Sequence, residues 1–161
     1  IGVCPAQGER VSAMFSGQHG GNMDLPLTAQ GTTIYLPVHE PGGLLMLGDL
    51  HAAQGHGEIV GGAIETSGRV TLKVSLVKGK PIEAPRFEDA RVIAAAGCDN
   101  DLRTAIRRAY AHLLTMVVER SGLNRWDAYM LISQCGSLVV GGLLEGPFTV
   151  AACLSRDLLD G

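Results

Sequence analysis

Glycine is concentrated near the start of this chain, where thirteen of its 22 glycines lie within the first 62 residues. A glycine inside a helix costs about 0.5–1 kcal/mol relative to alanine, because it loses more backbone freedom on folding than any other residue. The first half is therefore expected to be rich in turns and to contain no helix of any length. Short strands are the alternative, so we expect a β-sheet or sandwich there.

Four stretches of this half have the composition of strands. Residues 32–38, TTIYLPV, are β-branched and aromatic and end before a turn of proline and glycine. Residues 44–47 form a short apolar run, and residues 58–65 are strand-like after a polar turn. Residues 69–77, RVTLKVSLV, alternate apolar and polar with a period of two, which predicts a half-buried strand.

After Cys98 the period of the apolar residues becomes that of a helix. Asp99 or Asn100 can cap it and Gly122 can end it, which predicts a helix near residues 100–121. The apolar residues at helical spacing are Leu102, Ile106, Ala109, Tyr110, Leu113 and Val117.

A second helix is predicted near residues 124–135. Asn124 is its expected cap, and Gly136 follows its end. Its large side chains are expected in the core; they are Trp126, Tyr129 and Met130.

Further strands complete an α+β fold. Apolar runs at residues 92–94, 138–140 and 149–154 predict three more short strands. We therefore expect a β-rich part at residues 1–82, which carries the functional turns, packed with an α+β part at residues 83–161 that contains both helices.

Charge and cysteine usage limit the partners and the compartment. The net charge is −3, and no basic stripe with interleaved aromatic residues occurs, which argues against nucleic acid as a partner. No apolar run of membrane-spanning length is free of charge and glycine, so no membrane contact is expected. The four cysteines, Cys4, Cys98, Cys135 and Cys153, share no CxxC or CxxH spacing. Reduced thiols in a cytoplasmic protein are the expected reading.

The strongest concentration of reactive groups is a D-x-H-x4-H-x-E pattern. Asp49 and His51 are two residues apart and would share one face of a strand, as would His56 and Glu58. A hairpin through the intervening glycine-rich turn could bring both pairs together. Carboxylate and imidazole groups suit zinc and similar divalent ions. The alternative is a solvated polar turn without chemistry.

A second glycine-rich turn, GQHGGNMD, precedes it at residues 17–24. It carries His19, Asn22 and Asp24, so two polar turns flank one predicted strand. The chain also begins at Ile1 with the strand-like IGVCPA, which leads us to expect a piece of a longer protein.

These motifs together resemble the acetamidase/formamidase family. The run YLPV followed by EPGGLLMLGDLHAAQGHGEIVGGAIETS resembles its G-D-x-H-A-x-Q-G-x-G-E segment and the A-x-E strand end. GQHGGNMD, IGVCPA and AYMLISQCG resemble further family segments. The resemblance covers nearly the whole chain and corresponds to the C-terminal half of a family member.

The resemblance implies hydrolysis of a small linear amide, such as formamide or acetamide, to ammonia and a carboxylate. Some similar proteins open small lactams. Two residues depart from the family pattern, because Leu50 replaces a small residue and His56 replaces an acidic one. These departures bear on the substrate and the metal more than on the class of reaction.

The implied cofactor is a divalent metal, zinc in the first place, with calcium and magnesium as alternatives. Asp49 and His51 are the expected ligands, with His19 and His56 as further ligands.

The remaining polar residues are assigned to acid–base and oxyanion roles. Glu58 is the expected general base, and His19 is a second acid–base residue. Asn22 or Gln54 could donate a hydrogen bond to the developing oxyanion.

Two other classes of function stay open. The chain could be a non-catalytic module that binds a small amide or a metal, including one half of a split enzyme. A cupin-like metal oxygenase fits a glycine-rich β-scaffold more loosely. The expected partners are the missing N-terminal portion or a companion chain, and a homo-oligomer.

Overall fold

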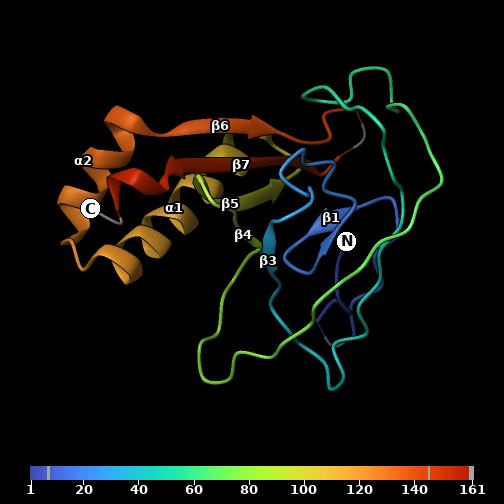
Figure 1. Ribbon diagram of the computed structural model, residues 1–161, viewed down its shortest axis with the longest axis horizontal. Helices are drawn as coiled ribbons and strands as arrows, with labels where there is room; N and C mark the ends of the chain where they lie inside the picture. Colours follow the sequence, from blue (N-terminus) through green and yellow to red (C-terminus); the bar gives the residue numbers. More distant parts are fainter. Residues whose placement is uncertain (7, 145, 160–161) are drawn as a thin grey trace.

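A five-stranded antiparallel sheet forms the centre of the computed structural model, which describes residues 1–6, 8–144 and 146–159 (Figure 1). Its strand order is β3-β4-β5-β7-β6. The strands are β3 (Thr33–Tyr35), β4 (Arg86–Glu88), β5 (Val92–Asp99), β6 (Ser137–Val140) and β7 (Phe148–Ser155). A separate pair of two-residue strands joins β1 (Ser16–Gly17) to β2 (Gly20–Gly21). The α+β class expected from the sequence is thereby confirmed.

Both faces of the central strands are buried, each against a different layer. Ile93 and Ala95 of β5 belong to the core shared with the helices. Their neighbours Ala94 and Ala96 pack in a second core with Met23 and other residues of the N-terminal loops. A strand covered on both faces needs no polar residue between its apolar ones, which explains the unbroken run VIAAAG.

Helix α1 (Leu102–Ser121) lies across β5 and β7 and supplies most of the helical side of the core. Its N-cap is Asp101, whose side chain accepts a hydrogen bond from the Thr104 N–H at 2.7 Å. The sequence prediction of Asp99 or Asn100 as cap is therefore wrong by one or two positions. The Asp99 carboxylate instead accepts from the Asp101 N–H at 3.0 Å and pairs with Arg108 at 2.9 Å.

Helix α2 (Arg125–Cys135) begins as predicted, because the Asn124 side chain accepts hydrogen bonds from two backbone N–H groups of the first turn. Only its Ala128 and Ile132 are buried. The prediction that its large side chains lie in the core is wrong, since Trp126 is 77% exposed and Tyr129 and Met130 are each 54% exposed. A short helix at the edge of a core buries one narrow stripe, and the i, i+4 pair of small and branched residues occupies it.

A short 3-10 helix, η1 (Arg156–Leu158), follows β7. Among the described residues, no helix combines the length and the apolar character needed to cross a membrane.

Loops replace most of the sheet expected in the first half. β3 confirms a strand within residues 32–38, but residues 44–47 and 58–65 contribute only isolated bridges, at Met46 and Glu65. Residues 69–77 are extended without a strand partner in the described part of the chain. A period-two pattern marks a strand face, but a ladder also needs a neighbouring strand, and none lies beside these residues.

The first and second parts of the chain share the sheet. β3 pairs with β4 from Thr33 opposite Glu88 to Tyr35 opposite Arg86, so the first part contributes an edge strand to the second. The domain boundary near residue 82 stays a prediction.

Candidate active site

Two polar loops meet beside the end of β6. The Gly142 N–H donates to the Met23 carbonyl at 3.3 Å, which attaches the first polar turn to the chain after β6. The Gly57 N–H donates to the Val140 carbonyl at 3.2 Å, which attaches the second loop to the last residue of the strand. The end of β6 therefore holds together two glycine-rich turns, the first of which contains only the two-residue strands β1 and β2 as regular structure.

The second loop folds back on itself, although not in the predicted register. His51 bridges Glu65, and the Ala52 N–H donates to the Ile64 carbonyl at 2.8 Å. Left-handed backbone at Gly57 (φ 86°) and Gly61 (φ 76°) spreads the reversal over more residues than the sequence suggested. The return brings Glu65 to one ring nitrogen of His51 and the expected Glu58 to the other, whereas His56 does not join them.

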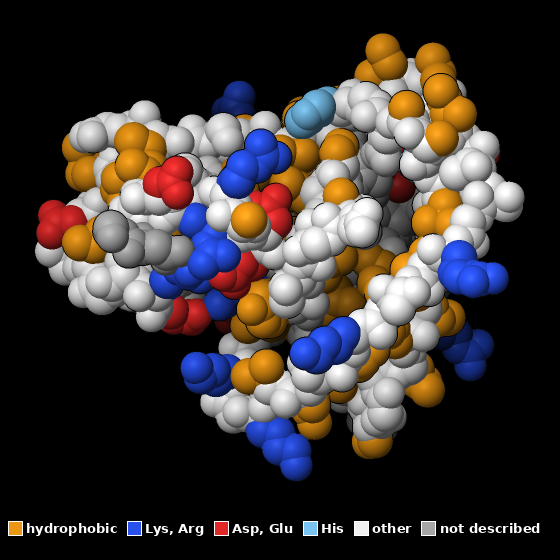
Figure 2. All heavy atoms as spheres, viewed as in Figure 1, with side chains coloured by type: hydrophobic (Ala, Val, Ile, Leu, Met, Phe, Trp, Pro, Cys, Tyr) orange, Lys and Arg blue, Asp and Glu red, His pale blue; other side chains and the backbone are white. Residues whose placement is uncertain are grey.

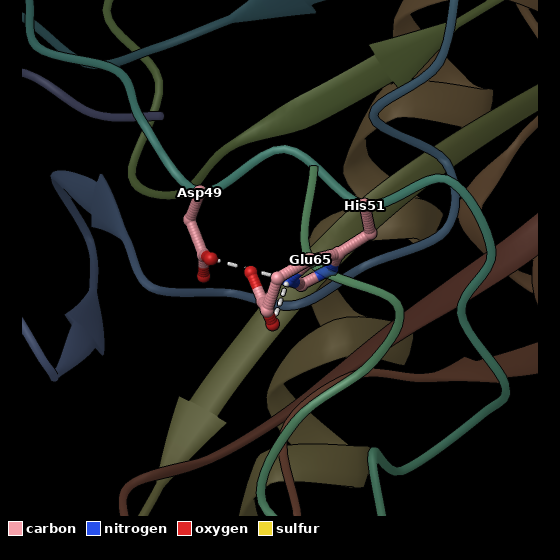
Figure 3. A group of neighbouring side chains, drawn as sticks. All are labelled: Asp49, His51 and Glu65. Carbon is pink, nitrogen blue, oxygen red and sulfur yellow. Dashed lines mark hydrogen bonds and ion pairs between the residues drawn. The ribbon is translucent and has the colours of Figure 1, made fainter. Parts of the chain in front are cut away.

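Asp49, His51 and Glu65 bring one potential ligand atom each to a common point (Figure 3). His51 Nε2 lies 3.1 Å from Asp49 Oδ1 and 3.0 Å from Glu65 Oε1. The ligand atoms of all three residues lie within 4.8 Å of one another. Two carboxylate oxygens and one imidazole nitrogen form a donor set that suits zinc and leaves room for a further ligand.

The other nitrogen of His51 faces oxygen acceptors. Nδ1 lies 2.9 Å from Gln54 Oε1 and 3.3 Å from Glu58 Oε1. The hydrogen bond to Gln54, and then the nearby carboxylates, raise the pKa of His51. Because Gln54 Oε1 can only accept, Nδ1–H donates to it, and with a cation between the carboxylates the Nε2 lone pair would be free to ligate that ion together with Asp49 and Glu65.

Gln54 connects the two loops. Its Oε1 faces His51, while its Nε2 donates to the main-chain carbonyl of Asp24. The side chain thus has both ends of its amide engaged, one in each loop.

Glu58 and Asp24 form an acidic pair behind His51. The Glu58 side chain is only 11% exposed, and its Oε1 has no hydrogen-bond partner in the described part of the chain. Burial, and then the Asp24 carboxylate, raise the pKa of Glu58. Burial, and then Asp49, raise the pKa of Asp24, whose Oδ2 accepts from Asn22 Nδ2 at 3.2 Å. Neighbouring carboxyls that both resist ionisation can retain a proton between them.

Backbone strain coincides with these carboxylates. Of the four non-glycine residues with positive φ among the described residues, three are Asp24 (φ 50°), Asp49 (φ 63°) and Glu58 (φ 44°). Left-handed backbone is unfavourable for residues with a Cβ and is concentrated at functional sites in proteins. The loops therefore hold three acidic groups in positions that an unstrained backbone would not give them.

The structure places His56 and His19 outside this group. His56 Nδ1 accepts a hydrogen bond from the Val140 N–H at 3.1 Å, so its ring joins the loop to β6. His19 packs against Gly17 and Gly21 and lines a cavity of about 830 Å³ together with His39 and His112. Burial lowers the pKa of His19.

That cavity contains none of the three converging residues. Its closest described pair of acid and imidazole is Glu83 Oε2 and His112 Nε2, 4.0 Å apart, with the Glu83 side chain 87% exposed. The candidate site is therefore the acidic cluster around His51, where the reactive groups are in contact.

Two members of the cluster had no role in the sequence prediction. Glu65 ends the strand-like run, and Asp24 ends the first polar turn. Both lie within the quoted motifs, so their positions were a usable signal, but the pairing that selects them depends on the path of the loop.

Comparison with known proteins agrees with the resemblance found in the sequence. The model of the Acetamidase/Formamidase family matches residues 6–160. The crystal structure of an acetamidase from Yersinia enterocolitica is 42% identical, with a TM-score of 0.94 over 98% of this chain and 48% of its own. An acetamidase from Bacillus halodurans is 35% identical, with a TM-score of 0.90 over 99% of this chain and 54% of its own.

A curated relative, the formamidase of Methylophilus methylotrophus, is 48% identical over 61 residues, which are 37% of this chain and 15% of the relative. The chain spans about half the length of the solved structures and no more than 37% of the curated relatives that it matches. The family model nevertheless covers almost every residue, and this chain belongs to the Acetamidase/Formamidase family.

Proposed function

We propose that this chain supplies the metal-binding site of a hydrolase that cleaves small linear amides, of the formamide and acetamide type, to ammonia and a carboxylate. The observation that supports it best is the convergence of Asp49, His51 and Glu65 beside the buried carboxyl of Glu58. Relatives named acetamidase and formamidase point to the same substrates.

The residues present fit a divalent metal. We propose Asp49, His51 and Glu65 as its ligands and zinc as the ion, because an imidazole nitrogen suits zinc better than calcium or magnesium. A zinc ion held there would polarise the amide carbonyl and lower the pKa of a water molecule.

Glu58 is the proposed proton carrier. Amide hydrolysis requires a base that takes a proton from the attacking water and an acid that protonates the departing nitrogen. A carboxyl with a raised pKa can perform both tasks in turn, and Asp24 beside it favours the protonated form.

The proposed roles of the two side-chain amides differ. Gln54 positions His51, because both ends of its amide are already bound within the protein. The Asn22 side-chain amide donates one of its two hydrogens to Asp24. Its second hydrogen can still donate, so Asn22 remains our proposed donor to the oxyanion.

The test compares metal content and ammonia release for the unaltered chain, His51→Ala and Glu58→Gln. We expect a stoichiometric metal that His51→Ala loses and Glu58→Gln keeps, with ammonia release lowered by about 10²–10⁴-fold in Glu58→Gln. Hydrolysis by a metal-free sample would refute the metal role and leave Glu58 and His19 for metal-free acid–base catalysis.

The same samples separate the alternatives. Because the chain spans about half of its solved relatives, the assay is repeated with the complementary half of the Yersinia acetamidase present. Activity that requires this addition indicates one half of a split enzyme. Metal binding without activity under either condition indicates a non-catalytic binding module.

We also propose a cytoplasmic location and a homo-oligomer. The four cysteines are free thiols, in agreement with a reducing compartment. The exposed apolar side chains of α2, Trp126, Tyr129 and Met130, support assembly. Light scattering on the purified chain measures its oligomeric state.

A further inference from the structure

Residues 69–77, the outer segment, are extended but unpaired. None of the backbone hydrogen bonds within the described part of the chain involves residues 69–76, and the segment belongs to neither sheet. Backbone N–H and C=O groups in an extended run are an open template for another strand. The segment therefore has the backbone of an edge strand without the ladder.

All side chains of the outer segment are exposed, and the apolar ones recur at alternate positions. Every second residue is apolar and exposed, and the four are Val70 (43%), Leu72 (43%), Val74 (73%) and Leu76 (66%). Alternate residues of an extended chain share one face, so these four form one apolar stripe. The intervening face carries Thr71, Lys73 and Ser75.

Other loops of the same part of the chain also expose apolar side chains. In Figure 1 the outer segment (lime green) leaves the right edge and crosses the lower front of the molecule diagonally, and Figure 2 shows hydrophobic side chains gathered over the loops at the upper right. Exposed apolar residues of loops in this part of the chain are Leu44, Leu45, Met46, Leu47, Ile59, Val60 and Ile64. Exposed apolar side chains in this number mark an interaction surface.

The family relatives indicate what covers it. The Yersinia acetamidase reproduces 98% of this chain at a TM-score of 0.94, and the match uses only 48% of its length. The same fold, including the outer segment, therefore exists in a protein whose chain is about twice as long as this one.

We propose that the outer segment is a docking strand for the polypeptide that corresponds to the other half of the family's length. A strand of that half pairs with residues 69–77 and buries the stripe of Val70, Leu72, Val74 and Leu76. Main-chain hydrogen bonds supply the affinity and the alternate apolar side chains supply the register, as in other cases of strand addition. The proposal rests on family membership and the surface, and it is independent of amide hydrolysis.

Hydrogen–deuterium exchange followed by mass spectrometry tests it. The probe is the part of the Yersinia acetamidase that this chain does not match, produced as a separate polypeptide and added in excess. In the dilute isolated chain the amides of residues 69–77 should exchange at nearly unprotected rates, because no ladder holds them. With the complementary half they should exchange at least about tenfold more slowly.

Two variants that each add one negative charge show which face of the outer segment makes the contact. Val74→Asp places a carboxylate in the stripe and should abolish the protection, whereas Ser75→Asp on the opposite face should retain it. Circular dichroism of both variants alone should match the unaltered chain, because neither side chain is buried.

Three results would overturn the proposal. Exchange at residues 69–77 that stays fast with the complementary half present excludes docking there. Equal loss of protection in Val74→Asp and Ser75→Asp excludes the apolar stripe as the contact. If residues 69–77 exchange slowly in the isolated chain, and their protection increases with the protein concentration, the surface binds a second copy of this chain.

Discussion

His51 has oxygen acceptors at both ring nitrogens, and only one side can be occupied by a metal. Asp49 and Glu65 lie at Nε2, whereas Gln54 and Glu58 lie at Nδ1. A ligating imidazole keeps its other N–H for an outer partner, which fixes the ring and its tautomer. Gln54 is suited to this because its oxygen cannot take up a proton.

Removal of the Gln54 side chain should therefore weaken metal binding without removing a ligand. In Gln54→Ala we expect the zinc affinity, measured by competition with a chromophoric chelator, to fall by about 10–100-fold. Gln54→Glu restores an acceptor for the His51 Nδ1–H and should recover most of the affinity. Equal loss in both variants would show that the tie to Asp24, and not the hydrogen bond to His51, is what matters.

The sequence places Asp49 and His51 only two positions apart, but their contact forms where the backbone of Asp49 is left-handed (φ 63°) and not on the face of a strand. Glu65 is fourteen positions beyond His51 along the chain. Its arrival there depends on left-handed backbone at several positions of the intervening loop. No local pattern encodes such a return.

At the scale of elements, the helices were the most predictable part. Asn124 and Gly122 act as the predicted caps, since capping depends on backbone groups within a few residues. The strands of the first half were less predictable, because a ladder depends on a neighbour that can lie anywhere in the chain. Residues 69–77 have an ordinary strand pattern and no neighbour in the described part.

The turn between β4 and β5 should make the sheet sensitive to acid. Asp89 Oδ1 accepts hydrogen bonds from the Arg91 and Val92 N–H groups, each at 2.7 Å, and the first of these contributes most to the lowered pKa of Asp89. A carboxylate with a folded pKa below its unfolded value stabilises the fold above the unfolded pKa, and this stabilisation is lost as the pH falls through the folded pKa.

Urea unfolding from pH 5 down to pH 2 measures this effect. The free energy of unfolding of the unaltered chain should approach that of Asp89→Asn as the pH falls below about 3.9, the usual aspartate value. Asp157→Asn, which removes an aspartate carboxylate from the 3-10 helix after β7, is the control. A constant difference between the unaltered chain and Asp89→Asn over this range would contradict the prediction.

For the molecule as a whole, the contact between α1 and β5 sets the separation of the layers. A Cβ on Gly97 would collide with the backbone of Ala105 and of Ala109, so the helix rests directly on the strand. Rigid backbone on both sides cannot yield as a side chain would.

Gly97→Ala should consequently lower the free energy of unfolding by about 1–3 kcal/mol or more, as overpacking does in other cores. Gly55→Ala is the matched control, since the added Cβ would meet no atom within 4 Å. It should leave stability unchanged or raise it by about 0.4–1 kcal/mol through the unfolded state. Chemical denaturation of both variants provides the comparison, and similar losses in the two would contradict a special contact at Gly97.

The sequence by itself determined whatever depends on neighbours along the chain. Caps and helical periodicity located both helices, and apolar runs located β5 and β7. These features are local, because backbone geometry relates residues a few positions apart.

Only the tertiary structure decided which distant groups meet. It brought Glu65 and Gln54 to His51, engaged His56 with β6, and placed His19 in a separate cavity. It also turned Trp126 outward and left residues 69–77 without a partner. Contacts of this kind depend on the path of glycine-rich loops and on which elements pack into the shared core. Neither can be predicted from a few consecutive residues.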